Sequence, residues 1–330
     1  MMPPAVRPTR RQALTAAAGL VAAPATRASA ADPPAASKPG VPAAYPFKLG
    51  TFDAVLANDG SFTFPGVQPF FAPEGKPGEI AAALKHAFLP ADRITLSCNS
   101  LFVSTGREKV LIDAGCGAMY PGMGHLAANL KAAGVKPEDV TAVVLTHGHF
   151  DHFGGLFDAA GKPAFPNAVL YLPEAEEAFW TGPNPDLSAA KVDDAMKAQV
   201  VAGSKKFFAG LPGKVERVKA GRKLFGGAVE LVAAPGHTPG MLAVLVDGGG
   251  EQLLHIADAA HHYVLMFARP DWSAGVDQDP QQAKTTRRKL FDRAAADRLR
   301  VAAAHLPFPG LGHVRAAGTG FEWVPEPWTA

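Results

Sequence analysis

The chain contains 330 residues, of which 48% are hydrophobic and 19% are charged. A chain of this length and composition can bury a large apolar core, as globular enzymes do. The chain has 32 Lys and Arg against 30 Asp and Glu. It therefore lacks the strong excess of positive charge that is typical of nucleic-acid-binding proteins. Beyond the N-terminal segment, no apolar run of 18 residues marks a membrane span. We therefore expect neither a nucleic-acid nor a membrane partner.

Residues 1–30 have the order of parts of an export signal. Thr9-Arg10-Arg11-Gln12-Ala13-Leu14 is a twin-arginine (Tat) pattern, an Ala-rich apolar stretch follows it, and Ala28-Ser29-Ala30 offers a cleavage site. Cleavage after Ala30 would remove four arginines and no acid, which leaves 28 basic against 30 acidic residues. The segment predicts a signal peptide and a protein exported to the periplasm or secreted.

The composition changes again after this segment. Residues 31–46 are rich in Pro, Ala, Ser and Gly, which predicts a flexible linker and places the folded domain at residues 47–330. Within the domain, residues 61–75 hold four phenylalanines among Pro and Gly and predict a loop. Aromatic side chains in such a loop either pack on the core or line an apolar pocket.

Residues 93–103 and 109–113 predict a β-hairpin, because two apolar runs flank the turn-type residues 105–108. The two cysteines of the chain, Cys98 and Cys116, lack the spacing of a metal or redox motif. Two buried free thiols are the preferred interpretation, since the twin-arginine route exports proteins that have folded where thiols stay reduced. A disulfide between them is the alternative.

The densest cluster of ligand-type side chains follows a predicted strand at residues 140–145. His147, His149, Asp151 and His152 come directly after it. Side chains of this kind, crowded into one turn, repel each other or stay unsatisfied unless a cation gathers them. Imidazole nitrogens and carboxylate oxygens suit zinc and similar divalent ions. The cluster therefore predicts a metal site at the end of the strand.

Helical patterns lie on both sides of this cluster. Residues 124–133 predict an amphipathic helix, and residues 173–180 and 187–209 predict two more, after a strand at residues 168–172. Trp180 precedes the loop between the last two helices, and it faces either the core or a pocket.

Three later strands each end in another ligand-type residue. His237 follows residues 229–232, Asp258 follows residues 253–257, and His305 follows residues 301–304. His237 stands between two prolines and two glycines, a rigid setting that favours a ligand role. A carboxylate at the end of an apolar strand is unfavourable unless a cation or a donor meets it. His313 competes with His305, which we prefer because it shares the strand-end placement.

Together these motifs resemble the signature of the metallo-β-lactamase superfamily. The resemblance implies an α+β fold, an αββα sandwich with the metals at one edge of the two sheets. It also implies two divalent metal ions, zinc first, although cobalt, manganese and iron accept the same donors. The first ion would take His147, His149 and His237, the second would take Asp151, His152 and His305, and Asp258 would bridge both. In the family the aspartate at the place of Asp113 supports the metal loop from behind, and an ordinary turn-capping role is its alternative.

The full ligand set is similar to that of binuclear lactonases and of methyl parathion hydrolases, and the second similarity extends over most of residues 47–330. It implies a binuclear hydrolase whose metal-bridging hydroxide attacks small, rather apolar lactones or organophosphate triesters. Asp258 and Asp151 would be its catalytic carboxylates, the latter as a ligand close enough to shuttle a proton. β-Lactam hydrolysis is the alternative reaction, although β-lactamases of this fold usually lack the bridging aspartate. A metal-binding protein for storage or sensing is the alternative outside enzymes, and relatives are often homodimers.

Two positions depart from these groups. Phe150 stands where parathion hydrolases often have proline, and His261 stands where acyl-homoserine lactonases have a tyrosine and parathion hydrolases an apolar residue. We expect Phe150, Trp180 and His261 to contact the substrate. For His261 the alternative is an ordinary surface histidine.

Overall fold

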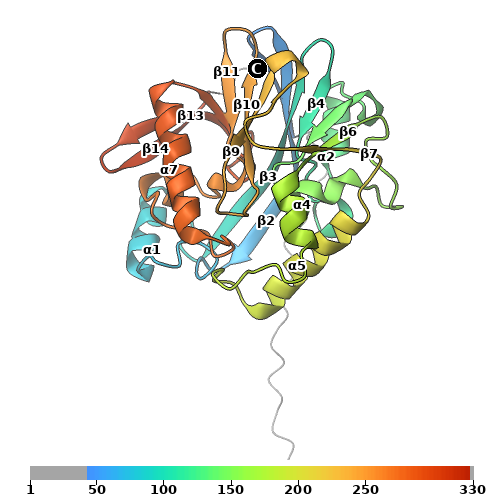
Figure 1. Ribbon diagram of the computed structural model, residues 1–330. Coiled ribbons are helices and arrows are strands. Elements are labelled where there is room, and N and C mark those ends of the chain that lie inside the picture. The colour runs from blue at the N-terminus through green and yellow to red at the C-terminus, as the bar shows by residue number, and fades with distance from the viewer. Residues whose placement is uncertain (1–42, 328–330) are drawn as a thin grey trace, which may run out of the picture. The chain divides into compact units, whose positions relative to one another are not determined.

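The computed structural model describes residues 43–327. The export signal expected at residues 1–30 and most of the expected linker lie outside the described residues, so both stay predictions. In the described chain, two β-sheets lie against each other and helices cover their outer faces (Figure 1). This arrangement confirms the predicted αββα sandwich.

Each sheet has seven strands, and in both sheets neighbouring strands follow one another in the sequence. The first sheet is antiparallel from β1 to β4 and parallel from β4 to β7. The second sheet runs from β8 to β14 and is antiparallel except for the parallel pair β11 and β12. The strands are β1 (Ala44–Leu49), β2 (Phe52–Pro65), β3 (Arg93–Ser104), β4 (Lys109–Ile112), β5 (Ala142–Val144), β6 (Val169–Pro173), β7 (Lys214–Val218), β8 (Lys223–Leu224), β9 (Val229–Ala233), β10 (Leu242–Asp247), β11 (Gln252–His255), β12 (Arg300–Ala302), β13 (Leu311–Ala317) and β14 (Gly320–Pro325).

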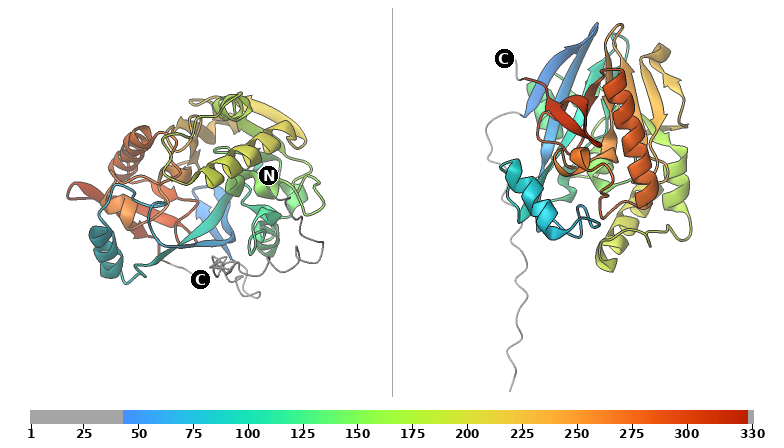
Figure 2. Two further views of the ribbon diagram at one scale, coloured as in Figure 1. Left: turned by 90° about the horizontal axis from the view of Figure 1, so that it is seen from below. Right: turned by 90° about the vertical axis from the view of Figure 1, so that its left-hand side faces the viewer.

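Helices occupy both outer faces of the sandwich. Figure 1 shows α7 on one side and α4 and α5 on the other, and the second view in Figure 2 looks onto the α7 side. The helices are α1 (Pro77–His86), α2 (Leu126–Ala132), α3 (Phe150–Phe153), α4 (Glu174–Thr181), α5 (Asp194–Ala209), α6 (Leu265–Ala268) and α7 (Pro280–Ala296).

The apolar core has three main layers that match this architecture. Between the sheets, alternate residues of facing strands, such as Leu56, Ile112 and Val244, are fully buried, as the two-residue period of a strand requires. Outside the first sheet, Leu130 of α2 and Phe207 of α5 pack against its outer face. Outside the second sheet, Phe291 of α7 fills the corresponding position.

Three predicted boundaries differ from the structure. Strand β1 begins at Ala44, inside the expected linker, because it pairs with β2 at the edge of the sheet, where a strand tolerates Pro46. Phe62 and Phe64 belong to the long strand β2 and not to a loop. Helix α5 begins at Asp194 and not at residue 187. The Asp193 side chain caps this start by accepting a hydrogen bond from the Met196 amide at 2.8 Å.

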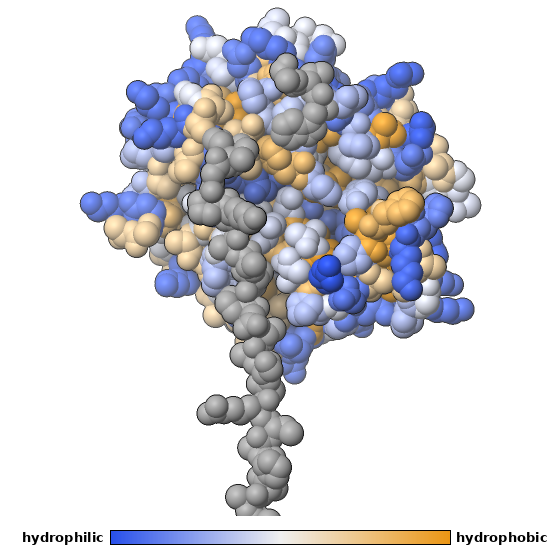
Figure 3. Space-filling view, turned by 180° about the vertical axis from the view of Figure 1, so that it is seen from behind, coloured by the Kyte–Doolittle hydropathy of each residue, from blue (hydrophilic) through white to orange (hydrophobic). Residues whose placement is uncertain are grey.

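The remaining predicted elements agree with the structure to within a few residues, among them the hairpin of β3 and β4 and the strand β5. In residues 43–327 no helix reaches the length and apolar character of a membrane span. The face opposite to that of Figure 1 mixes hydrophilic and hydrophobic residues (Figure 3).

Candidate metal centre

The seven expected ligands come from both sheets and meet at one edge of the sandwich. His147, His149, Asp151 and His152 follow β5, while His237 follows β9. Asp258 lies in a short 3₁₀ turn, Ala257–Ala259, after β11, and His305 follows β12. All seven belong to groups whose ligand atoms lie within 4.8 Å of one another.

The first group contains three histidines and Asp258. His149 Nδ1 lies 3.1 Å from His147 Nε2 and 2.9 Å from His237 Nε2. All three rings are at most 8% exposed. Three ring nitrogens therefore converge on one point from two separate loops.

The second group contains Asp151, His152 and His305. His305 Nε2 lies 3.4 Å from Asp151 Oδ2, and His152 Nε2 lies 3.9 Å from Asp151 Oδ1. Asp151 is the most exposed of the three, with 15% of its side chain accessible.

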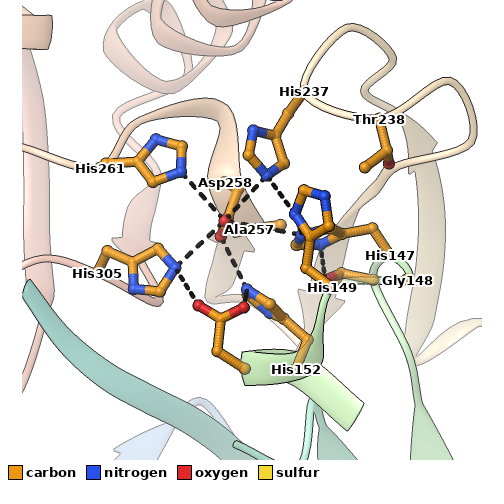
Figure 4. Close-up of polar contacts among 12 residues, drawn as sticks. His147, Gly148, His149, His152, His237, Thr238, Ala257, Asp258, His261 and His305 are labelled. Atoms are coloured by element: carbon orange, nitrogen blue, oxygen red, sulfur yellow. Dashed lines mark hydrogen bonds and ion pairs between the residues drawn. The ribbon is translucent and has the colours of Figure 1, made fainter. Parts of the chain in front are cut away.

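Asp258 stands between the two groups, as Figure 4 shows. Its Oδ2 lies 3.3 Å from His237 Nε2 and 3.2 Å from His305 Nε2. Its Oδ1 lies 3.3 Å from His152 Nε2. One carboxylate thus faces ligand atoms of both groups, which is the arrangement expected of a bridging ligand.

Hydrogen bonds to the ring nitrogens that point away from the site determine which nitrogen of each histidine can bind a cation. Asp277 Oδ1 accepts from His237 Nδ1 at 2.9 Å, Asp113 Oδ2 from His152 Nδ1 at 2.7 Å, and the Ser97 carbonyl from His305 Nδ1 at 2.8 Å. Because ionised carboxylates and carbonyls only accept, each Nδ1 carries the hydrogen. In the neutral rings each Nε2 then presents a lone pair to the centre of the site.

The same reasoning applies to His147 through Thr146. The Thr146 hydroxyl donates to Asp113 Oδ2 at 2.8 Å. It must therefore accept the hydrogen of His147 Nδ1 at 3.0 Å, and His147 Nε2 is left as a lone pair. Asp113 thus orients residues of both groups, which confirms its predicted supporting position.

These donors fit divalent cations. Two buried atoms of the site, His152 Nε2 and Asp258 Oδ1, make no hydrogen bond within the described part of the chain. A buried carboxylate oxygen and an imidazole lone pair without hydrogen-bond partners are unfavourable unless a cation lies between them. The set of nitrogen and oxygen donors is one that zinc and similar ions accept.

Residues 93–305 match the family model of the metallo-beta-lactamase superfamily. The chain belongs to this superfamily. A probable metallo-hydrolase of Mycobacterium bovis is 32% identical over 216 residues, which cover 58% of this chain and 66% of the mycobacterial protein, just under two thirds of its length. An N-acyl homoserine lactonase of Bacillus cereus is 22% identical over 198 residues, 54% of this chain and 69% of that one.

Solved structures of the superfamily resemble the whole domain. AidC, a dizinc quorum-quenching lactonase, superimposes with a TM-score of 0.83 at 30% identity, over 87% of this chain and 98% of its own. AbOPH, a hydrolase in the beta lactamase superfamily, superimposes with a TM-score of 0.78 at 28% identity, over 88% of this chain and 100% of its own.

The two groups of this superfamily site differ in their electrostatics. Burial holds the pKa of His147 and His149 well below the ordinary value. Burial also disfavours a charge on His152, but the carboxylates of Asp258 and Asp113 outweigh it and hold the pKa well above the ordinary value. The pKa of His305 is raised in the same way, by Asp258 against the effect of burial. Burial therefore keeps His147 and His149 neutral, whereas His152 and His305 attract protons.

An apolar cavity of about 240 Å³ opens directly onto the ligands. Its walls include Phe62, Phe64, Phe70 and Phe150, and its floor includes Asp258 and His261. The pocket interpretation therefore holds for three of the four phenylalanines of residues 61–75, while Phe71 is fully buried. His261 is 3% exposed, so it is not a surface histidine, and its Nε2 lies 3.2 Å from Asp258 Oδ2.

Other expected residues are placed differently. Trp180 is fully buried behind His149, with ring centroids 5.7 Å apart, and its indole N–H donates to Glu176. It belongs to the core and not to the cavity wall, because helix α4 turns that face toward the first sheet. His313 lies on β13, outside both groups, and donates to the Leu299 carbonyl at 3.0 Å. Cys98 and Cys116 are buried and free, as expected.

Two buried carboxylates that support the site were not predicted. Asp277 orients His237, and Glu176 bonds to the loops on which three of the histidines lie. Asp277 lies in an irregular segment and Glu176 in an acidic helix start that resembles a solvated surface. Neither has a local motif that could have revealed it.

Proposed function

We propose that the protein is a metal-dependent hydrolase with a binuclear centre that acts on uncharged lactones, and also on organophosphate triesters. The observation that carries this proposal is the sharing of Asp258 between two groups of ligand atoms at the floor of an apolar cavity. The nitrogen and oxygen donors suit zinc. The names of the structural neighbours, a dizinc lactonase and AbOPH, support the same class.

The residues divide between the two ions as the two groups do. His147, His149 and His237 would hold one ion and Asp151, His152 and His305 the other, while Asp258 would touch both. A pair of such ions would, when bound, lower the pKa of a water toward 7 and polarise the carbonyl or phosphoryl oxygen of the substrate. Among the described residues, the cavity wall holds no serine or cysteine, and such a water would supply the nucleophile instead.

Two side chains of the cavity can assist the reaction directly. Asp151 is half-buried at the cavity and can pass a proton to the leaving group. His261 stacks on His305, with ring centroids 5.3 Å apart and an angle of 8° between the planes. Its Nε2 hydrogen faces Asp258 Oδ2 at 3.2 Å, and it would also reach a substrate carbonyl or phosphoryl oxygen bound beside that carboxylate.

The cavity wall favours an uncharged substrate. Among the described residues, none that lines it is Lys or Arg. A β-lactam carries a carboxylate that would find no Lys or Arg partner in this wall, and a phosphodiester would meet the same lack. The phenylalanines around the centre instead suit an acyl chain or an aryl group.

A substrate panel on metal-analysed protein tests the proposal. The panel contains N-acyl homoserine lactones of increasing chain length, a simple aliphatic lactone, a paraoxon-type aryl triester and a β-lactam. We expect turnover of lactones, with kcat/KM rising with chain length, slower turnover of the triester, and little hydrolysis of the β-lactam.

Two outcomes would contradict the proposal. A protein that contains two metal ions and hydrolyses neither lactones nor triesters would support a storage or sensing role. Preferred turnover of the β-lactam would move the protein to the alternative reaction.

A further inference from the structure

A buried carboxylate on α4 connects the two loops that hold the first group of histidines. Glu176 is fully buried in the first turn of the helix. One of its oxygens meets the loop of His147 and His149, and the other meets the loop of His237. Figure 4 shows these loops, with Gly148 and Thr238 next to the histidines.

We propose that Glu176 is a positioning residue that fixes the first metal position by clamping both loops through their backbones. The proposal rests on the metal centre proposed above. The spacing of the His147, His149 and His237 imidazoles then depends on Glu176, which forms hydrogen bonds to their loops and not to the rings.

Four hydrogen bonds carry the clamp. Oε2 accepts from the Gly148 amide at 2.8 Å and from the Trp180 indole at 2.8 Å. Oε1 accepts from the Thr238 hydroxyl at 2.5 Å and from the Gly240 amide at 2.7 Å. Gly148 lies between His147 and His149, and Thr238 directly follows His237. The carboxylate therefore joins positions 28, 62 and 64 residues away in the sequence.

The four partners match an ionised carboxylate and no other side chain of this shape. Each of them donates, and an ionised carboxylate only accepts. A glutamine would direct its amide hydrogens at two of these donors, which leaves buried groups unpaired. The match holds three elements in one arrangement: α4 and the two loops.

Two glycines allow the close approach that the clamp needs. A Cβ added to Gly148 would lie 2.4 Å from the indole nitrogen of Trp180, and one added to Gly240 would lie 2.5 Å from the Glu176 amide nitrogen. Any larger residue would push a loop away from α4. Ser204 of α5 completes the hold on Gly148 by donating to its carbonyl at 2.7 Å.

The clamp favours the first metal position over the second. Within residues 43–327, Glu176 forms no hydrogen bond or ion pair with Asp151, His152 or His305. The supports of His152 and His305 are the Asp113 carboxylate and the Ser97 carbonyl. Loss of the clamp should therefore lower the affinity of the His147, His149 and His237 position first.

The test compares Glu176→Gln with Glu177→Gln in the full chain. Glu177 is the next residue on α4, where it pairs with Arg217 at the surface, so its variant is a matched control. Zinc is titrated into each metal-free protein, and zinc-edge anomalous diffraction gives the occupancy of each position separately. Changes to groups that orient metal ligands typically cost about 10- to 100-fold in affinity, and we expect this loss at the first position of Glu176→Gln alone.

Each outcome decides the matter. A purely structural role of Glu176 would lower the unfolding temperature of the metal-free protein and weaken both positions equally, and this result would overturn the proposal. If Glu176→Gln does not fold, Thr238→Val removes one of the four hydrogen bonds with little change of shape. A selective loss of a few-fold at the first position is then expected, and unchanged occupancy would contradict the clamp.

The readouts are independent of catalysis. A wild-type protein that binds two zinc ions and hydrolyses none of the panel would refute the proposed function, while the comparison of the two positions would still test the clamp.

Discussion

The two groups of the proposed metal centre differ in the protonation of their imidazoles before a cation binds. In the first group, burial holds the pKa of His147 and His149 well below the ordinary value, so these two imidazoles are neutral. In the second group, His152 and His305 face Asp258 and Asp151, and the pKa of both imidazoles is raised. The first half is a preformed set of lone pairs, whereas the second holds protons that a cation must displace.

The supports of the two halves differ as well. Side chains of the outer layer, Glu176 on α4 and Asp277 before α7, hold the first group. The second group depends on Asp113 after β4 and on the Ser97 carbonyl of β3. The comparison teaches that the first position can be altered without the second, through carboxylates that hold its loops or its imidazoles.

Replacement of Asp258 by Ala should have the largest effect, because this carboxylate belongs to both halves. If the variant loses about 4 kcal/mol of transition-state stabilisation, kcat/KM falls roughly 1000-fold. We expect this loss together with weaker binding at both positions, measured by kinetics and metal analysis of the same sample. A change in metal content at one position alone would show that Asp258 is not shared.

The pair Asp277→Asn and Asp113→Asn should separate the halves. Asp277 orients His237 only, whereas Asp113 orients His152 and, through Thr146, His147. We expect a loss of about 10- to 100-fold in affinity, confined to the first position for Asp277→Asn and present at both for Asp113→Asn. Competition with a chelator, followed by metal analysis, measures both; identical profiles would contradict the assignment.

Acidification should weaken the second position more steeply than the first. Below their raised pKa values His152 and His305 are protonated in the metal-free protein, so each proton that zinc displaces lowers the affinity about tenfold per pH unit. His147 and His149 of the first group lack this competition because their pKa values are lowered. Calorimetric zinc titrations in buffers of different ionisation enthalpy count the released protons, and equal pH slopes would remove the distinction.

The smallest effect is expected at His261, which lies beside both halves. His261→Phe keeps an aromatic ring on His305 but removes the hydrogen bond to a substrate oxygen. Such a bond is worth about 1 kcal/mol, so kcat/KM should fall only about 5- to 10-fold with metal content unchanged. A variant that loses zinc would instead identify His261 as a ligand, as its grouping with Asp258 and His305 allows.

The ligands were predictable from the sequence and their supports were not. Apolar strands precede His147, His237, Asp258 and His305, so a local pattern predicts each of them at one edge of the sheets. Glu176 and Asp277 act on groups 28 to 64 residues away. Several of those partners are backbone amides, which leave no trace in the sequence.

The same limit explains the smaller differences. The residues of β1 predict a linker because a proline and alanines are typical of a tether as well as of an edge strand. Trp180 could face either way because the two sides of a short helix are distinguished only by packing, and the structure turns it to the core.

The ligands before β6 follow strands of the first sheet, and those after β9 follow strands of the second sheet. A bound ion would therefore cross-link the two sheets. Anything that binds the folded chain and not the unfolded one adds its binding free energy to folding. Removal of the ions would then destabilise the packing of the two sheets at the edge that holds the ligands. In a metal-poor environment the protein would lose folded-state lifetime as well as activity.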